Sequence, residues 1–282
     1  MSAKHTLQLS NNTSVSYWEY NPGKKQVIVM VHGFRGTHHG LEKIVEALPM
    51  YRIIVPDLPG FGESPAFADQ PHSLESYVTF LDDFIAALGL HASPVLLGHS
   101  FGSIIASHFA AEHTEAIDKL ILVNPISAPA LQGPRGVMTR LAIMYYWLGR
   151  TLPPAASKPW LANKAIVKVM SKTMAKTKDP AMLEFIHDQH LRHFSTFASP
   201  QVVAEAFRAS VTSDVTETVH KLNVETLLIV GDKDDITPLE KQQDLAKKIP
   251  GATLVTLQNV GHLIHYEKPA EAATAIQAFL QQ

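Results

Sequence analysis

A serine between two glycines is the first residue of the chain whose surroundings suggest chemistry. The motif G-x-S-x-G spans residues 98–102 with Ser100 at its centre, after the apolar segment 94–97 and before the helix-like apolar segment 104–111. A strand that turns sharply into a helix needs small residues around the serine, because a Cβ atom there would collide with neighbouring backbone. The pattern therefore predicts that Ser100 is a nucleophile; the alternative is a serine that only completes a tight turn.

Three aspartates follow the apolar segment 226–230, at Asp232, Asp234 and Asp235. A serine nucleophile needs a base, and the base needs an acid to orient it; in a strand–turn–helix arrangement the acid comes after the serine and before the histidine. All three carboxylates follow a strand-like segment, so we expect them on the same edge of the sheet as Ser100. Their position alone leaves each of them a candidate.

His262 follows the next apolar segment, 253–257, and is the histidine best placed to act as the base. His265 lies three residues further on, toward the start of a helix, and is expected to be structural. His99 adjoins the serine, but its side chain should leave the opposite side of the turn.

Short apolar segments alternate with helical ones along most of the chain, and they must position these residues. Continuous apolar runs are typical of strands buried on both faces, and apolar residues spaced by three and four are typical of helices. The predicted strands are 26–31, 51–55, 94–97, 120–123, 226–230 and 253–257; the predicted helices are 39–48, 73–88, 101–113, 239–248 and 269–280. An amino-terminal hairpin, 6–9 and 13–20, is expected around Asn11 and Asn12. This alternation predicts an α/β fold with a mostly parallel sheet flanked by helices.

The alternation breaks once, over residues 127–220. This segment has no strand-like apolar run, and its helical stretches are interrupted by Pro129, Pro134, Pro153, Pro154, Pro159, Pro180 and Pro200. About 90 residues are too many for a structureless loop in a compact domain. We therefore expect a helical cap over 127–220, inserted into a core made of 1–126 and 221–282. The insertion leaves the sheet where open α/β sheets bind ligands, which favours a lid over the site; extra helices packed on the core are the alternative.

With these motifs the chain resembles the α/β-hydrolase superfamily, especially its capped esterase, lipase and C–C hydrolase branch. The resemblance covers about residues 13–126 and 221–282 and rests on four motifs: His32-Gly33-Phe34, the loop 57–64, the serine motif, and Gly231-x-x-Asp234 followed by Gly261-His262. It implies an α/β-hydrolase fold in which Asp234 is the acid, with Asp232 and Asp235 as loop formers or solvated neighbours. One departure is Ser103, where many relatives have glycine. A small residue there should still permit close helix packing.

The backbone N–H groups of Phe34 and Phe101 are the expected oxyanion hole. Phe101 follows the nucleophile at the positive end of a helix, where an amide can stabilise developing negative charge. Phe34 follows Gly33, whose missing side chain lets the backbone approach a substrate.

Arg35 is an unusual neighbour for that hole. Its guanidinium group could bind a substrate carboxylate or phosphate, since the planar fork suits both. The alternative is a structural pair with a loop carboxylate, at Asp57 or Glu63.

The composition excludes several kinds of site and bears on metal binding. The 282 residues include no cysteine, which excludes a disulfide framework, a thiolate metal site, an iron–sulfur cluster and a cysteine nucleophile. The 15 histidines include two close sets, and we expect surface or hydrogen-bonded side chains there and no metal. These sets are His38 with His39, and His187 with His190 and His193.

The charge and the apolar pattern bear on partners and location. The formal net charge of −2 argues against a nucleic-acid partner. The amino terminus lacks the apolar region of a signal peptide, and no apolar run approaches the ~20 residues of a membrane span, so we expect a soluble cytoplasmic protein. Nothing in the sequence indicates an oligomeric state.

Taken with the resemblance, these observations predict a serine hydrolase that cleaves a carboxylic ester through an acyl-enzyme and requires no cofactor. Its small-molecule substrate should carry an apolar acyl or alkyl part, because the cap segment 137–148 is rich in Met, aromatic and aliphatic residues that would line a pocket. One alternative is a C–C bond hydrolase of the dienone-acid type, or a related lyase, in which Arg35 would hold the carboxylate. His99 favours esterases, since the C–C hydrolases more often carry Asn before the serine. The other alternative is a non-catalytic ligand-binding member of the fold.

Overall fold

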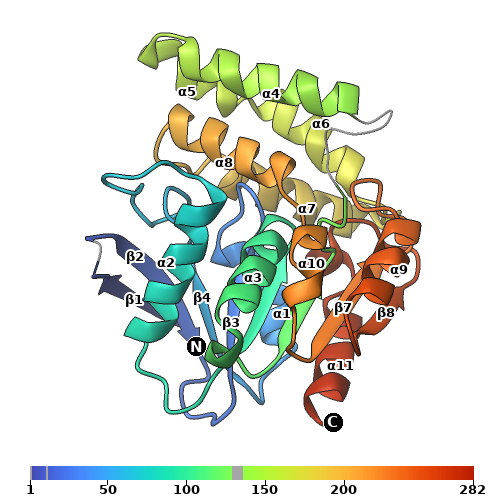
Figure 1. Ribbon diagram of the computed structural model, residues 1–282. Helices are drawn as coiled ribbons and strands as arrows, with labels where there is room; N and C mark the ends of the chain where they lie inside the picture. The colour runs from blue at the N-terminus through green and yellow to red at the C-terminus, as the bar shows by residue number, and fades with distance from the viewer. Residues whose placement is uncertain (1, 11, 129–135) are drawn as a thin grey trace.

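An eight-stranded sheet forms the centre of the computed structural model, which describes residues 2–10, 12–128 and 136–282 (Figure 1). The strand order is β1-β2-β4-β3-β5-β6-β7-β8. The strands are β1 (Ser2–Gln8), β2 (Ser14–Tyr20), β3 (Val27–Val31), β4 (Arg52–Pro56), β5 (Val95–His99), β6 (Leu120–Val123), β7 (Thr226–Gly231) and β8 (Thr253–Leu257). Strands β3 to β8 run parallel, while β1 pairs antiparallel with β2, and β2 with β4. The mostly parallel α/β fold predicted from the sequence is confirmed.

The two faces of the sheet bury separate apolar cores. Ile28 and Met30 of β3 face one core, with α1 (Glu42–Glu46) and α11 (Pro269–Leu280). Val29 and Val31 face the other core, with α2 (Leu74–Ala87), α3 (Phe101–Glu112) and α9 (Leu239–Lys248). Because successive side chains of a strand point to opposite faces, strands covered on both sides appear in the sequence as continuous apolar runs.

The amino-terminal hairpin differs from its predicted bounds. Strand β1 begins at Ser2, four residues before the predicted start, and its side chains are mostly exposed at the edge of the sheet. An edge strand in solvent has no apolar run by which it can be recognised. Asn12 has a positive φ of 64°, as suits a turn, whereas Asn11 lies outside the described residues.

Between β6 and β7 the described chain forms α-helices, which we call the cap. They are α4 (Gly136–Thr151), α5 (Pro154–Leu161), α6 (Lys164–Met174), α7 (Pro180–His193) and α8 (Pro200–Thr212). Pro154, Pro180 and Pro200 each stand in the first turn of a helix, where proline is favoured because its missing N–H would have no intrahelical partner. Pro129 and Pro134 lie outside the described residues.

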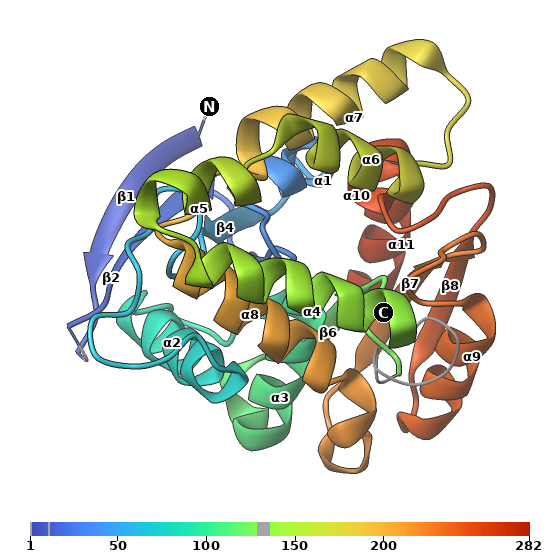
Figure 2. The same cartoon turned by 90° about the horizontal axis from the view of Figure 1, so that it is seen from above.

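The cap lies above the sheet and its flanking helices, at the top of the molecule in Figure 1. The view from above shows α4, α5 and α6 spread over the core (Figure 2). Helix α8 packs beneath α4, and α6 packs against α7. The chain returns to the core through the short helices η3 (Val215–Glu217) and η4 (Val219–Lys221). Within the described ranges, no helix has both the length and the apolar character to cross a bilayer.

Candidate active site

Ser100 occupies a strained turn between β5 and α3. Its backbone has φ 53° and ψ −118°, a region that residues other than glycine seldom adopt. A Cβ on Gly98 would lie 2.3 Å from the carbonyl oxygen of Gly102, and a Cβ on Gly102 would lie 2.3 Å from the carbonyl oxygen of Val31. Backbone on both sides of the turn therefore requires glycine at both positions.

Ser103 braces this turn from within α3. Its hydroxyl donates to the Ser100 carbonyl oxygen at 2.5 Å and accepts from the Ile126 N–H at 3.2 Å. Ser103 is fully buried, so helix α3 packs closely although a serine stands where glycine is common. The side chain ties the turn to the segment that follows β6.

His262 joins Ser100 to Asp234. Its Nε2 lies 2.8 Å from the Ser100 Oγ, and its Nδ1 lies 2.8 Å from the Asp234 Oδ2. Both His262 and Asp234 are buried. With the Nδ1 proton donated to Asp234, the Nε2 atom is free to accept the serine proton.

Asp234 is held in its ionised form by its neighbours. Its Oδ1 accepts from the N–H groups of Ile236 at 2.7 Å and Thr237 at 3.1 Å, and its Oδ2 accepts from the Thr237 hydroxyl at 2.6 Å. Burial acts to raise its pKa, but the charge and hydrogen bond of His262 and the Thr237 hydrogen bonds outweigh it and lower the pKa to about 2.

The other two carboxylates of this loop have different partners. Asp232 accepts from the Val260 N–H at 3.2 Å, and Asp235 pairs with Lys176, which follows α6 in the cap. The structure thus brings Asp234 to His262, and it holds Asp232 and Asp235 in contacts with the adjacent loop and the cap.

The two segments that carry the predicted oxyanion amides meet beside the nucleophile. Phe101 is the first residue of α3, directly after Ser100. Gly33 lies against Ser100, since a Cβ at Gly33 would be 3.2 Å from the Ser100 Cβ. The next residue, Phe34, packs its ring on Tyr146 and Phe207 of the cap, with centroid distances of 5.6 and 5.3 Å.

Arg35 faces the cap. It is 1% exposed, and its backbone has a positive φ of 57°. Its Nε donates to the Phe194 carbonyl oxygen at 2.7 Å, its Nη2 to the Leu161 carbonyl oxygen at 3.0 Å, and its Nη1 to the Tyr146 hydroxyl at 3.4 Å. The guanidinium group also lies over the rings of Phe194 and Phe197. Binding of a substrate carboxylate by Arg35 would require these contacts to open.

The alternative pair between Arg35 and a loop carboxylate is wrong. Asp57 instead accepts from the His38 backbone and side chain, at 2.7 and 2.9 Å, and from the Glu63 N–H at 2.9 Å. The Glu63 carboxylate pairs with Lys4 of β1. Asp57 therefore has its partners in the core and Glu63 at the edge strand, and Arg35 connects the core to the cap.

Two further histidines lie behind His262. The Nε2 of His99 is 3.2 Å from the backbone oxygen of His262, and the His99 ring stacks edge-on to His265 at 4.3 Å. Burial, and the neighbouring histidines, lower the pKa of His99 to about 3 and lower that of His265 well below its ordinary value. Both rings are neutral at pH 7 and support the His262 loop from inside the core.

Asn124 is a positioning residue that the sequence interpretation missed. It is fully buried at the end of β6, with a positive φ of 43°. Its Nδ2 donates to the Gly261 carbonyl oxygen at 3.0 Å, and its Oδ1 accepts from the Gly231 N–H at 2.9 Å. One side chain therefore ties the acid loop to the histidine loop. One feature of the sequence could have indicated this role. Asn124 directly follows a predicted buried strand, so it lies on the same edge of the sheet as Ser100.

The histidine sets form separate contacts. His38 stacks on Trp18 and bonds to Asp57, while the His39 Nδ1 lies 3.2 Å from a Glu42 oxygen. His38, His39 and Glu42 each have a ligand atom within 4.8 Å of the others, so this is the place in the described residues where a metal could be held. In the cap, the His187 Nδ1 lies 2.7 Å from the Ser171 Oγ, and the His193 ring contacts the His39 ring at 4.2 Å.

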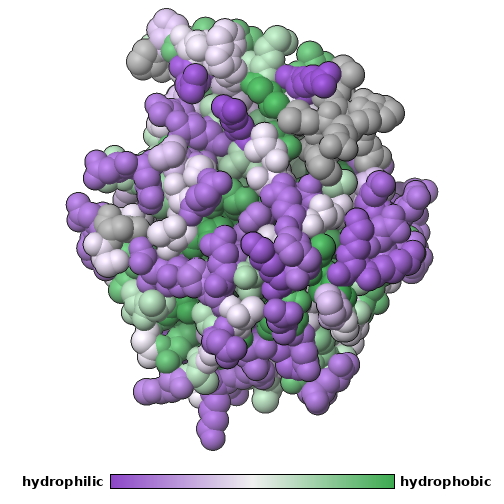
Figure 3. All heavy atoms as spheres, in the orientation of Figure 1, coloured by the Kyte–Doolittle hydropathy of each residue, from purple (hydrophilic) through white to green (hydrophobic). Residues whose placement is uncertain are grey.

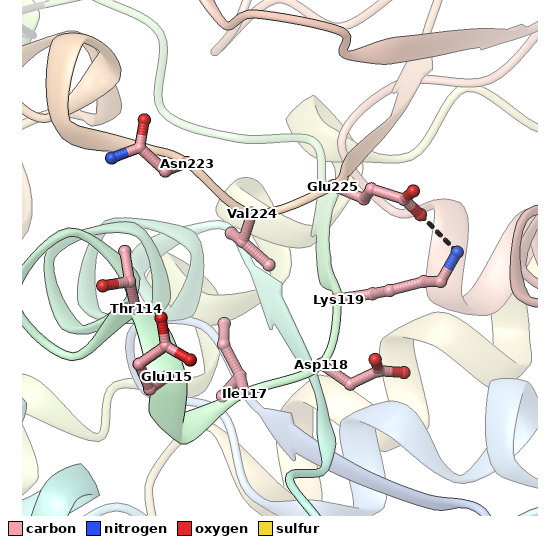
Figure 4. Close-up of a pocket in the computed structure, with 8 residues that line it drawn as sticks. All are labelled: Thr114, Glu115, Ile117, Asp118, Lys119, Asn223, Val224 and Glu225. Carbon is pink, nitrogen blue, oxygen red and sulfur yellow. Dashed lines mark hydrogen bonds and ion pairs between the residues drawn. The ribbon is translucent and has the colours of Figure 1, made fainter.

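A polar cavity of about 510 Å³ lies at the other end of the sheet (Figure 4). Asp118 and Lys119 line it just before β6, and Glu225 lines it just before β7, so it opens at the amino ends of these strands. An ion pair joins Lys119 to Glu225 across it. This cavity and the Ser100 site are at opposite edges of the sheet.

The chain is similar to known proteins in both sequence and structure. The sequence model of the alpha/beta hydrolase fold matches residues 26–269. Lipase 3 of Moraxella sp. strain TA144 is 24% identical over 97% of this chain and 83% of its own length, and Lipase 1 of Psychrobacter immobilis is 26% identical over the same shares. The solved structure of the esterase EaEST from Exiguobacterium antarcticum superposes with a TM-score of 0.81 at 20% identity, covering 99% of this chain and all of the esterase chain.

Proposed function

The chain belongs to the alpha/beta hydrolase fold family, and we propose that it is a serine hydrolase that cleaves a carboxylic ester with an apolar acyl or alkyl part. The observation that carries the proposal is the continuous hydrogen-bonded array from the Ser100 Oγ through His262 to Asp234, with 2.8 Å at each step. Nucleophile, base and orienting acid are then within hydrogen-bond reach of one another.

In the first half of the reaction, the Ser100 Oγ attacks the ester carbonyl carbon while the His262 Nε2 takes the serine proton. The carbonyl electron pair moves onto oxygen, where the N–H groups of Phe34 and Phe101 stabilise the negative charge. The tetrahedral intermediate then expels the alcohol, which leaves with the proton from the His262 Nε2. The acyl group remains on Ser100.

In the second half, water replaces the alcohol. Its proton passes to the His262 Nε2 as its oxygen attacks the acyl carbon, and collapse of the second tetrahedral intermediate releases the carboxylic acid and returns the proton to Ser100. Asp234 stays ionised throughout and stabilises the imidazolium that forms twice per turnover.

The preference for an apolar substrate is supported by the residues beside the nucleophile. Phe34, Tyr146 and Phe207 form an aromatic cluster between the core and the cap. We propose that the helices of residues 127–220 act as a lid, because Arg35, the residue after Phe34, bonds to their backbone at Leu161 and Phe194. The names of the two lipases fit this preference.

The C–C bond hydrolase is the weaker proposal. It relied on Arg35 to hold the carboxylate of a dienone acid, and the Arg35 guanidinium bonds to Phe194 and Leu161 instead. We therefore place ester cleavage first.

A fluorophosphonate probe tests the proposal. Wild-type protein should gain one adduct, located at Ser100 by mass spectrometry, and Ser100→Ala should gain none. Ser107→Ala is the matched control, because Ser107 is also a buried serine of α3 and donates to the Ile104 carbonyl oxygen within the helix. A folded wild-type protein without an adduct would falsify the serine hydrolase. A parallel assay of esters of increasing chain length and of a dienone acid then separates the two bond types.

A further inference from the structure

The outer face of the cap exposes large apolar side chains. Of the eight large apolar residues that are exposed in the described chain, six lie within residues 141–169. They are Leu141, Met144, Trp147, Leu148, Trp160 and Val169. Single exposed apolar residues are ordinary on a protein surface, but a group confined to one short stretch indicates an interaction site.

Helix α4 shows the clearest pattern, because it is apolar on both sides. Tyr146 is 3% exposed and packs on Phe207 of α8 at a ring distance of 4.4 Å. Met144 and Trp147 are 50% and 51% exposed. At 100° per residue, positions 141, 144, 147 and 148 share one face, which the protein itself leaves uncovered.

The longer segment that contains these residues, from the start of α4 to just beyond α6, is strongly basic. Residues 136–178 contain no Asp or Glu and eight Lys or Arg residues: Arg140, Arg150, Lys158, Lys164, Lys168, Lys172, Lys176 and Lys178. Because the whole chain has a formal net charge of −2, this +8 leaves a net −10 on the remaining residues. The stretch that exposes apolar side chains therefore carries a net positive charge, whereas the rest of the chain is net negative.

These groups lie on one side of the molecule. Helices α4, α5 and α6 form the layer nearest the viewer when the molecule is seen from above (Figure 2). The space-filling view shows apolar and weakly polar residues over α4 and α5 at the top, with strongly hydrophilic ones between them (Figure 3). On α6, Val169 is 65% exposed, between the exposed Lys168 and Lys172.

We propose that α4, α5 and α6 form a docking surface for an anionic phospholipid bilayer. Tryptophan and aliphatic side chains enter the boundary between head groups and acyl chains, while Lys and Arg bind lipid phosphates beside them. Long basic side chains also reach from an apolar surface to the head groups. The proposal concerns where the protein binds and does not depend on which bond the Ser100 site cleaves.

Charge decides against a second copy of the chain as the occupant. A symmetric dimer through this face would bring together two surfaces that each carry the six Lys and Arg residues of α4, α5 and α6. An acidic protein would match the charge, but it would need an apolar surface that accepts both Trp147 and Trp160. A bilayer supplies negative charge and apolar volume together.

Vesicle binding of the full chain tests this proposal. We expect the protein to co-sediment with vesicles of phosphatidylcholine and phosphatidylglycerol in equal parts, and to bind vesicles of phosphatidylcholine alone at least about tenfold more weakly. Dibrominated lipid in the anionic vesicles should quench the tryptophan emission, because Trp147 and Trp160 are exposed whereas Trp18 is buried. Equal binding to both vesicle types, or binding without quenching, would overturn the proposal.

Two matched pairs of variants locate the surface. Lys164→Glu with Lys168→Glu should weaken binding at least about tenfold, whereas Lys24→Glu with Lys25→Glu reverses two exposed lysines outside the cap and should leave it unchanged. Trp147→Ser should weaken binding, whereas Met50→Ser, at the most exposed apolar residue outside the cap, should not. Circular dichroism and turnover of a short water-soluble ester verify that each variant is folded. Equal loss in a variant and its control contradicts the assignment.

Sedimentation velocity without lipid distinguishes the other occupants. A monomer supports the bilayer. A dimer that Trp147→Ser dissociates would assign the surface to a second copy, and tight binding of an acidic protein with no vesicle binding would assign it to that class; either result overturns the proposal.

Discussion

The Nε2 of His262 lies 2.8 Å from the Oγ of Ser100, although 162 positions separate the two residues in the sequence. The parallel sheet accounts for this proximity. Strands β5, β6, β7 and β8 are consecutive neighbours, so the loops that leave their carboxyl ends meet at one edge. Asn124, at the end of the strand between the serine and the acid, then fixes the spacing of the other two loops.

Asp234→Asn should lower kcat about 10⁴-fold. The amide keeps the shape of the side chain but presents the wrong partner to the His262 Nδ1, which disturbs the tautomer that accepts the serine proton. Steady-state kinetics on a chromogenic ester measure this effect. Asp235→Asn is the matched control, because its carboxylate pairs with Lys176, and kcat should stay within about twofold. Equal losses in both variants would contradict the assignment of the acid.

Gly98→Ala should displace Ser100 and lower both activity and stability. The added Cβ would meet the Gly102 carbonyl oxygen at 2.3 Å, and backbone cannot rotate away as a side chain can. We expect a loss of at least about 2 kcal/mol in the free energy of unfolding, measured by urea denaturation. Gly23→Ala is the control, because nothing lies within 4 Å of its Cβ position. A stable, fully active Gly98→Ala protein would refute the close-packed turn.

Arg35→Ala should loosen the cap without changing the preference between substrates. The substitution leaves the Phe194 and Leu161 carbonyl oxygens without their buried donor, a cost of about 3 kcal/mol. Limited proteolysis should then cut the cap faster. The ratio of kcat/KM between an acidic and a neutral ester should stay the same, and a selective loss on the acidic ester would restore Arg35 as a substrate-binding residue. Arg150→Ala removes an exposed cap arginine and serves as the control.

The protein should lose stability as the pH falls below the ordinary histidine pKa of about 6.5. In the folded protein, burial lowers the pKa of His99 to about 3 and that of His190 to about 4, and it also lowers the pKa of His265. Below pH 6.5 the unfolded chain therefore binds protons at these histidines, whereas the folded protein does not. The free energy of unfolding keeps its full value above pH 6.5 and declines below it, by about 1 kcal/mol per pH unit for each group.

Urea denaturation at a series of pH values measures this slope. His190→Leu should make the decline shallower, because it removes one neutral buried ring whose Nδ1 has no hydrogen-bond partner in the described residues. His91→Gln replaces an exposed histidine and should leave the slope as it is in the wild type. A steeper decline in His190→Leu would contradict the explanation.

The sequence predicted those parts of the molecule that depend on local sequence patterns. Strands β6 and β8 begin and end at their predicted residues. The run 120–123 is buried throughout and is therefore continuously apolar in the sequence. The glycines around Ser100 were recognisable because a sharp strand–helix turn has narrow steric demands. His262 was singled out by its place after a strand, whereas the place of the acid loop left three aspartates open, and only the resemblance to the α/β-hydrolase superfamily selected Asp234.

What sequence reasoning missed depends on contacts between distant segments. The partners of Arg35 are the backbone carbonyl groups of Leu161 and Phe194, far along the chain. No local sequence pattern predicts that a side chain will bond to a distant backbone carbonyl. The bridge that the Asn124 side chain forms between Gly231 and Gly261 was missed for the same reason. Helix α10 (Ile264–Glu267) is a single turn, too short for apolar periodicity to reveal.

The anchoring of the cap by Arg35 has a thermodynamic consequence. Arg35 directly follows Phe34, so the residue that holds the cap shares a peptide bond with a proposed oxyanion donor. Cap position and oxyanion stabilisation are then linked, and linkage between two equilibria is reciprocal. A ligand that places negative charge in the oxyanion hole should favour the closed cap by the same free energy by which the closed cap favours that ligand. The difference in affinity for a transition-state analogue between the wild type and Arg35→Ala would therefore measure this coupling free energy.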